Sequence, residues 1–188
     1  SIDTREYDAM AHTAEIQDRA IEIREKLGNP RWVILGVDRL DYTKGIEERL
    51  GAVERLLDRH PELRGRCVFA QLAAPSRTIM PAYRALGERV EALAERINGR
   101  YGNAAYHPVI LLRAHHEPPT VFRYYRAADV CYVSSLHDGM NLVAKEFIAA
   151  RDDERGVLVL SKFTGAAREL TEALIVNPYD LDEAADAL

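Results

Sequence analysis

The chain has 188 residues, of which 47% are apolar and 29% charged, and its formal net charge is −5. This length predicts one domain that buries its core without disulfide or metal support. The acidic balance argues against a nucleic-acid partner bound through bulk positive charge. No stretch approaches the ~20 apolar residues that span a bilayer, so we expect no membrane partner. A small anionic ligand held by a few placed cations remains compatible with this composition.

The two cysteines, Cys67 and Cys131, each lie inside an apolar run. Both are expected in the core, and a reducing cytoplasm is the expected location of the protein. The chain starts at Ser1 and stops at Leu188 within a helical pattern, so we expect it to be a piece of a longer protein.

Apolar runs and helical patterns alternate along the chain. Short continuous apolar runs flanked by breakers are typical of strands buried on both faces, whereas apolar residues three and four apart predict amphipathic helices. In chain order, the predicted elements are a helix over 4–27, a strand over 32–37, a helix over 45–59, a strand over 68–73, a helix over 79–98, a strand over 109–112, a helix over 119–127, a strand over 130–133, a helix over 142–151, a strand over 157–160, a short helix over 166–170, a strand over 174–176 and a helix over 181–188.

This alternation predicts an α/β fold with a doubly wound parallel sheet, a Rossmann-like domain that takes in residues 1–188. In such a sheet, ligands bind beyond the carboxyl ends of the strands. The loops that follow Val37, Ala74, Arg113 and Ser135 are therefore the places where a site is expected.

The segment that joins the first predicted strand to the next helix carries two cations, Arg39 and Lys44. Arginine offers a planar fork for phosphate oxygens and lysine a point charge, so the pair suits a diphosphate. The structural alternative is that Thr43 caps the helix while both cations pair with Asp38 and Asp41. Neither G-x-x-x-x-G-K-[ST] nor G-x-G-x-x-G, the common phosphate-binding motifs, occurs in the chain.

The segment after the fourth predicted strand combines two acids with turn-forming residues. Gly139 permits a tight turn, and Asn141 can cap a helix that starts near Leu142, whose first amides would attract an anion. Asp138 before this helix and Glu146 one turn inside it would flank the amides. One acid could bind sugar hydroxyls and the other ribose hydroxyls, with a diphosphate between them. The alternative is a capping aspartate and a solvated glutamate.

Together these segments resemble the trehalose-6-phosphate synthase family, glycosyltransferase family 20, over essentially the whole chain. The matching stretches are residues 36–45 (GVDRLDYTKG), 74–77 (APSR), 96–102 (RINGRYG) and 138–146 (DGMNLVAKE). The resemblance implies a two-domain, B-type glycosyltransferase fold. Residues 1–188 would form its C-terminal, donor-binding half, and the N-terminal acceptor half would be absent from this chain.

The resemblance also implies a role for each matching residue. Arg39 and Lys44 would hold the donor diphosphate and stabilise the leaving group, and Asp138 would bind the transferred glucose, so these three are the catalytic candidates. Glu146 would hold the ribose, and Arg77 would reach across the cleft to the acceptor phosphate. Further donor contacts, mainly through the backbone, are expected from Gly139, Met140, Asn141, Leu142 and Val143.

The loop after the third predicted strand carries His115 and His116. The resemblance implies that this loop touches the nucleotide base, which makes His116 a donor-binding candidate. His116 stands where the family places an aromatic residue, so the choice among UDP, GDP and ADP stays open. The alternative is a surface pair, and a zinc site is not expected because no third and fourth ligand have suitable spacing.

The implied activity is a retaining transfer of glucose from a nucleotide-glucose, with UDP-glucose favoured, to glucose 6-phosphate, giving trehalose 6-phosphate. No cofactor and no metal are expected, because no paired-aspartate metal motif lies in a ligand-edge loop. Two alternatives stay open: a related synthase with another acceptor, such as glycerol 3-phosphate, and a catalytically silent nucleotide-sugar binding module. We expect no turnover by residues 1–188 in isolation, and a homo-oligomer of the full-length protein is compatible with the sequence.

Overall fold

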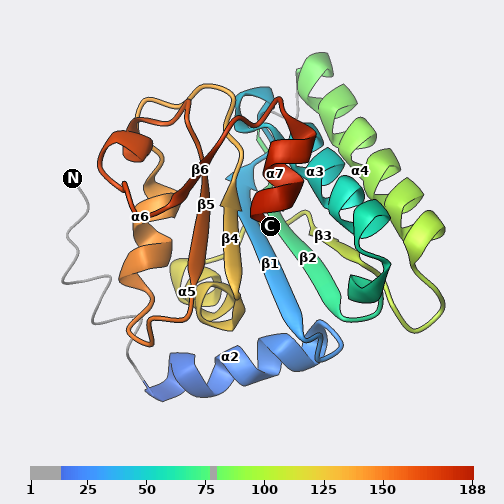
Figure 1. The fold of residues 1–188 in the computed structure, drawn as a ribbon, viewed down its shortest axis with the longest axis horizontal. Coiled ribbons are helices and arrows are strands. Elements are labelled where there is room, and N and C mark those ends of the chain that lie inside the picture. Colours follow the sequence, from blue (N-terminus) through green and yellow to red (C-terminus); the bar gives the residue numbers. More distant parts are fainter. Residues whose placement is uncertain (1–13, 77–79) are drawn as a thin grey trace.

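The computed structural model describes residues 14–76 and 80–188, and within these ranges six strands form one sheet in the order β3-β2-β1-β4-β5-β6 (Figure 1). The strands are β1 (Trp32–Arg39), β2 (Cys67–Ala74), β3 (Val109–Leu112), β4 (Val130–Val133), β5 (Val157–Ser161) and β6 (Leu174–Val176). Every neighbouring pair runs parallel. The prediction of a doubly wound parallel sheet is confirmed.

Helices cover both faces of the sheet. The α-helices of the described residues are α2 (Ala14–Lys26), α3 (Ile46–Arg59), α4 (Pro81–Tyr101), α5 (Pro118–Ala127), α6 (Leu142–Ala149) and α7 (Leu181–Ala187). Helices α3, α4 and α7 pack on one face, and α2, α5 and α6 pack on the other (Figure 1). Each helix therefore buries one apolar stripe against the sheet.

The core is divided by the sheet because successive residues of a strand point to opposite faces. On β1, Val33 and Leu35 pack on the α2/α5/α6 side, whereas Ile34 packs on the α3/α4/α7 side. Both cysteines are buried and free, with Cys131 in the first of these clusters and Cys67 in the second. Continuous apolar runs in the sequence thus correspond to strands buried on both faces.

The strand order reverses between β1 and β4. The chain runs outward from β1 through β2 to β3, and then returns to the other side of β1 as β4. Ile34 pairs with Val130 and Leu35 with Cys131, so β1 and β4 lie side by side. The loops that follow these two strands leave the same edge of the sheet at this switch point, and this is the edge where doubly wound sheets bind their ligands.

Strand β1 is longer than predicted, and this changes where Arg39 lies. The sequence predicts a strand that ends at Val37, but the backbone of β1 pairs with β2 as far as Arg39 beside Ala74. Asp38 and Arg39 are consequently held by the sheet at its carboxyl edge rather than in a loop.

The helix predicted over 45–59 is confirmed as α3, and a 3-10 helix over Tyr42–Lys44, which the sequence does not predict, precedes it. The helix predicted over 166–170 is a 3-10 helix over Gly165–Arg168. The helix predicted over 4–27 is described from Ala14 onward. No described helix combines the length and the apolarity needed to cross a bilayer.

Candidate functional site

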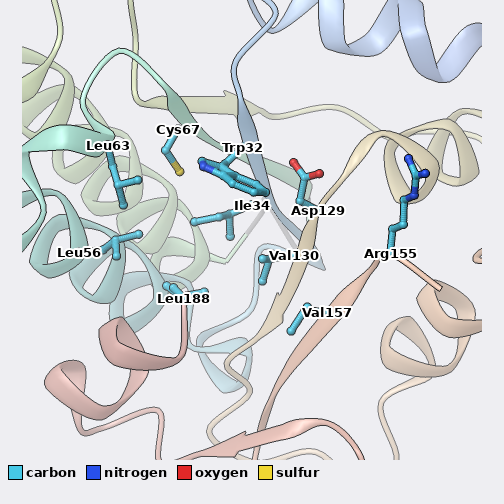
Figure 2. Close-up of a pocket in the computed structure, with 10 residues that line it drawn as sticks. All are labelled: Trp32, Ile34, Leu56, Leu63, Cys67, Asp129, Val130, Arg155, Val157 and Leu188. Carbon is cyan, nitrogen blue, oxygen red and sulfur yellow. The ribbon is translucent and has the colours of Figure 1, made fainter. Parts of the chain in front are cut away.

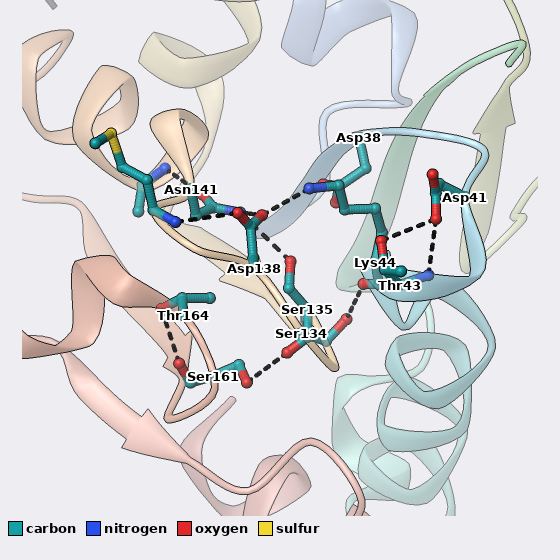
Figure 3. Close-up of polar contacts among 12 residues, drawn as sticks. Asp38, Asp41, Thr43, Lys44, Ser134, Ser135, Asp138, Asn141, Ser161 and Thr164 are labelled. Atoms are coloured by element: carbon teal, nitrogen blue, oxygen red, sulfur yellow. Dashed lines mark hydrogen bonds and ion pairs between the residues drawn. The ribbon is translucent and has the colours of Figure 1, made fainter. Parts of the chain in front are cut away.

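The loops after β1 and β4 meet at the switch point. The Leu136 amide donates a hydrogen bond of 2.8 Å to the Thr43 carbonyl. Lys44 Nζ lies 2.6 Å from Asp138 Oδ2, and these side chains are only 18% and 15% exposed (Figure 3). Two candidate residues that are 94 positions apart in the chain are therefore direct neighbours.

Gly45 allows this close approach of the two loops. Its φ is +63°, and a Cβ at this position would lie 2.4 Å from the Ser134 carbonyl oxygen. Only glycine fits there without strain. The Ser134 hydroxyl in turn donates to the Gly45 carbonyl at 2.7 Å, so the start of α3 is docked on the end of β4.

A fully buried arginine of α3 supports both loops. Arg49 donates hydrogen bonds to Asp38 Oδ2 at 2.7 Å, to Gln71 Oε1 at 2.8 Å and to Ser134 Oγ at 3.0 Å. Burial raises the pKa of the Asp38 carboxyl above its ordinary value, and the charge of Arg49 opposes part of that rise. The network therefore joins α3 to β1, to β2 and to the residue that follows β4.

Arg39 is exposed, and within the described residues its guanidinium makes no hydrogen bond or ion pair. Asp41 accepts hydrogen bonds from the Thr43 amide at 2.9 Å and from its hydroxyl at 2.8 Å, which caps the 3-10 turn. Asp38 pairs with the buried network, and Lys44 pairs across the switch point. The alternative of local ion pairs and a Thr43 helix cap is therefore wrong.

Asn141, rather than Asp138, caps α6. Its φ is +73°, and its Oδ1 accepts from the Ala144 amide at 2.9 Å, as the sequence predicts for this residue. Asp138 accepts from the Met140 amide at 3.3 Å and from Asn141 Nδ2 at 3.2 Å. Burial acts to raise the pKa of the Asp138 carboxyl, but these bonds and that from Lys44 outweigh it and lower the pKa. Asp138 is thus held as a carboxylate just before the N-terminus of α6.

Glu146 lies one turn inside α6 and is half-buried. Its Oε2 accepts a hydrogen bond of 3.0 Å from the hydroxyl of Tyr125, and in the described part of the chain its Oε1 has no hydrogen bond. Burial raises the pKa of the carboxyl, and the bond from Tyr125 opposes part of that rise. The alternative of a solvated glutamate is wrong.

A cavity of about 460 Å³ opens at the carboxyl ends of β1, β2 and β3. It brings together Arg39, Glu146, Val143 and His116, which come from three separate segments of the chain. Its lining residues are Val37, Asp38, Arg39, Leu72, Ala74, Pro75, Ala114, His115, His116, Val121, Val143 and Glu146. The other donor candidates, Lys44, Asp138, Gly139, Met140, Asn141 and Leu142, are not part of this lining.

The two histidines of the β3–α5 loop reach the cavity wall. The His115 side chain is 78% exposed, and His116 Nδ1 lies 3.0 Å from the Ala114 carbonyl oxygen. Among the residues that the structure describes, no group of three or more His, Cys, Asp or Glu side chains could hold a metal ion. The acceptor-phosphate candidate, Arg77, lies outside the described residues.

A second cavity, of about 510 Å³, lies at the opposite edge of the sheet, where β1, β4 and β5 begin (Figure 2). Its wall is mainly apolar and includes the exposed ring of Trp32. The acid on this wall, Asp129, accepts from the Val33 amide at 2.7 Å and from Arg24 at 3.1 Å, so its charge is used in the fold. Arg155 points away from the other lining side chains (Figure 2). This cavity lacks the converging cations that a diphosphate needs.

The loop after β5 supports the loop after β4, which the sequence does not predict. The Ser161 hydroxyl donates to the Ser135 carbonyl at 2.6 Å (Figure 3). Asp138 forms an isolated parallel bridge with Thr164, and the Gly165 amide donates to the Asp138 carbonyl at 2.9 Å. The position of the Asp138 backbone therefore depends on a segment more than twenty residues further along the chain.

The sequence analysis did not predict the two buried residues that hold candidate-site carboxylates, namely Arg49, which contacts Asp38, and Tyr125, which contacts Glu146. Arg49 lies three residues after Ile46 and four before Val53, on the apolar face of the predicted helix, and a charge on such a face signals a buried partner. For Tyr125, the spacing from Phe122 marks a buried face but gives no sign of the partner of its hydroxyl.

Known proteins resemble this chain over its whole length. Residues 1–188 match a family model described as Glycosyltransferase family 20. A trehalose-6-phosphate synthase of Mycolicibacterium smegmatis is 48% identical over 191 residues, which cover 100% of this chain and 37% of that protein. A bifunctional trehalose-6-phosphate synthase/phosphatase of Thermoproteus tenax is 43% identical and covers 98% of this chain and 25% of that protein.

Solved structures share the fold. A structure from E. coli bound with UDP-2-fluoro glucose is similar with a TM-score of 0.92 at 43% identity, and the match covers 99% of this chain and 41% of that one. An alpha,alpha-trehalose-phosphate synthase (UDP-forming) from Burkholderia xenovorans, in complex with glucose-6-phosphate, has a TM-score of 0.93 at 40% identity, covering 100% of this chain and 41% of that one. The chain thus spans between 25% and 41% of the length of these relatives.

Proposed function

Because the chain belongs to glycosyltransferase family 20, we propose that it is the donor-binding half of a trehalose-6-phosphate synthase. The proposed reaction transfers glucose, with retention, from UDP-glucose to glucose 6-phosphate. One observation carries the proposal: two cations, Arg39 and Lys44, and two acids, Asp138 and Glu146, gather at the switch point of a doubly wound sheet. Relatives of the same fold bound with UDP-2-fluoro glucose and with glucose-6-phosphate support it.

The donor would lie along the carboxyl edge of the sheet. Arg39 and Lys44 would neutralise its diphosphate, each through charge-assisted hydrogen bonds worth about 1.5–3 kcal/mol. Lys44 would exchange its 2.6 Å contact with Asp138 for phosphate, which frees a carboxylate oxygen to accept from the glucose hydroxyls. Glu146 would hold the ribose, and His116 would lie near the base. The backbone of residues 139–143 would complete the sugar and phosphate contacts.

The proposed chemistry is electrostatic. As the bond from the anomeric carbon to the phosphate breaks, negative charge builds on the leaving oxygen, and fixed cations at that place lower the barrier. In the donor complex Asp138 would accept from the glucose hydroxyls, and Glu146 accepts from Tyr125 and would hold the ribose, so neither acid is favoured as a nucleophile. We therefore propose a same-face transfer in which the leaving phosphate oxygen takes the proton of the acceptor hydroxyl. Arg39 and Lys44 would supply the positive charge without a divalent metal or other cofactor.

The acceptor side of the reaction is proposed on the resemblance. Arg77 would bind the acceptor phosphate, and an N-terminal half that this chain lacks would form the opposing wall. A cleft closed on both sides excludes water, which strengthens each charge interaction within it. The chain by itself is therefore proposed to bind the nucleotide without turning over substrate, and the full-length enzyme is proposed to act in the cytoplasm.

Calorimetric titration of the chain with UDP, GDP and ADP tests the donor site. We expect saturable binding of UDP, and at least about tenfold weaker binding in Arg39→Ala and in Lys44→Ala. Arg66→Ala is the matched control, because Arg66 is an exposed arginine just before β2, at the opposite edge of the sheet. Equal loss of affinity in the control would show that the effect is one of bulk charge.

The full-length enzyme tests the reaction. Trehalose 6-phosphate should form from UDP-glucose and glucose 6-phosphate, and formation should be lost in Arg39→Ala and in Lys44→Ala. A folded full-length protein that binds UDP but makes a product only with another acceptor, such as glycerol 3-phosphate, would replace the proposed acceptor. Absence of nucleotide binding by that protein would favour a silent relative and overturn the proposal.

A further inference from the structure

Tyr125 does not line the cavity, yet its hydroxyl contacts a carboxylate that does. It comes from α5, is fully buried, and its hydroxyl donates to Glu146 Oε2 at 3.0 Å. Glu146 lines the 460 Å³ cavity, whereas Tyr125 does not. The hydrogen bond of Tyr125 therefore reaches the cavity through Glu146.

The tyrosine ring is held in one orientation by its neighbours. The Phe122 ring packs edge-on at 5.6 Å between centroids, with an interplanar angle of 87°, and the Phe147 ring packs at 6.1 Å and 72°. Both phenylalanines are 1% exposed. A ring fixed on two sides places its hydroxyl at a fixed point. Phe147 also follows Glu146 directly in α6, so one helix carries both a ring that packs on Tyr125 and the carboxylate that accepts its hydrogen bond.

In the hydrogen bond between Tyr125 and Glu146, the tyrosine hydroxyl is the donor and the carboxylate is the acceptor. Burial raises the pKa of the Tyr125 hydroxyl well above its usual value, so the group stays protonated and donates. Glu146 accepts this bond with Oε2, and its Oε1 has no hydrogen bond within the described chain. A glutamate side chain that is not held samples many rotamers and loses conformational entropy when a ligand orders it.

We propose that Tyr125 is a positioning residue that locks Glu146 with one oxygen turned to the ligand, and so makes the site selective for a ribose with free hydroxyl groups. The proposal rests on the proposed function, because it takes Glu146 as the group that holds the ribose of a nucleoside diphosphate. A preordered acceptor loses less entropy on binding, which raises affinity only for ligands that use it.

Titration with two ligands separates this role from a general structural one. The ligands are UDP and 2′,3′-dideoxy-UDP, which lacks the hydroxyls that Glu146 would bind. The wild-type chain should bind UDP at least about tenfold more tightly than the dideoxy analogue. Tyr125→Phe keeps the ring and both edge-on contacts but removes the hydroxyl. It should weaken UDP binding about threefold to tenfold, while binding of the dideoxy analogue stays within about twofold of wild type.

Two further variants complete the design. In Glu146→Ala the two ligands should bind equally, and adding Tyr125→Phe to it should change nothing more, because the tyrosine acts through the glutamate. Tyr132→Phe is the matched control. Tyr132 is also buried, but within the described chain its hydroxyl has no hydrogen-bond partner. Removal of the Tyr132 hydroxyl should leave the affinity for both ligands unchanged. Circular dichroism of each variant checks that it is folded.

The outcomes distinguish the inference from the function on which it rests. Equal weakening of both ligands in Tyr125→Phe, or no change in either, would overturn the positioning role while leaving the donor site intact. A wild-type chain that binds UDP no better than the dideoxy analogue would also overturn it, since the ribose would not be read. Absence of UDP binding altogether, in a folded full-length protein, would overturn the proposed function and this inference together.

Discussion

Replacing Arg49 by methionine should remove a large part of the stability of the domain, because it strands one partner of a buried ion pair. The Arg49 side chain is 0% exposed and that of Asp38 is 4% exposed, so water cannot replace the lost guanidinium. Gln71 Oε1 would lose its donor as well. Removal of one member of such a pair costs about 3–5 kcal/mol. The total stability of a domain is about 5–15 kcal/mol, so the loss should be plain in a denaturation curve.

Urea denaturation followed by far-UV circular dichroism measures the effect in Arg49→Met, Asp38→Asn and the double variant. The double variant should be more stable than Arg49→Met, because asparagine removes the stranded charge. Arg55→Met is the control: the same change in the same helix removes an exposed pair, 46% and 62% accessible, between Arg55 and Asp182, and should cost less than about 1 kcal/mol. A loss below about 1 kcal/mol in Arg49→Met, or a double variant no more stable than it, would refute the reasoning.

The pH dependence of the same variant gives a second check. Burial already raises the pKa of Asp38 in the native network, and without Arg49 the opposing charge is gone, so the pKa should rise further. A carboxyl whose folded pKa exceeds its unfolded value stabilises the fold fully below the unfolded pKa, and that contribution is lost as the pH rises through the folded pKa. The deficit of Arg49→Met should therefore be smaller near pH 5 than near pH 8, and the reverse trend would contradict a buried, stranded carboxylate.

Three further predictions concern the two loops and the carboxylate of the cavity. Gly45→Ala should destabilise the domain by more than about 2 kcal/mol, because a φ of +63° is combined with a Cβ 2.4 Å from a backbone oxygen. Gly99→Ala, within α4 with nothing within 4 Å, should stabilise it by about 0.5–1 kcal/mol, and urea denaturation compares the two. Lys44→Met should cost only about 1–2 kcal/mol, since Asp138 keeps its other hydrogen-bond donors, yet calorimetry should show at least about tenfold weaker UDP binding. Burial raises the pKa of the Glu146 carboxyl, and protonation below that pKa removes the charge that would accept from the ribose, so UDP affinity should fall as the pH drops through it. The fall should be steeper than in Glu146→Gln, where only the titration of the ligand itself remains. Parallel curves for the two proteins would show that this carboxylate does not bind the ligand.

Local pattern in the sequence determined the elements and the fold class. Apolar residues three and four apart, as in α3, identify helices because they make one stripe, and short runs such as residues 130–133 identify strands buried on both faces. The residue types of the segments after β1 and β4 also predicted local roles, because a cation, a turn glycine and a capping asparagine each act through their own side-chain or backbone chemistry. Asn141 capping α6 and Glu146 one turn inside it are two predictions of this kind that the structure confirms.

Only the tertiary structure decided which side chains pair with one another at the site. From the sequence, Lys44 has aspartates three and six positions away as natural partners, but it pairs with Asp138, 94 positions distant, because β4 lies beside β1 in the sheet. The bond from Tyr125 to Glu146 depends in the same way on how α5 packs against α6. Strand order and helix packing result from burying apolar surface over the whole chain, which no local pattern encodes. The chemistry available at the site was therefore readable from the residues, whereas the contacts that set its geometry and pKa values came from the fold.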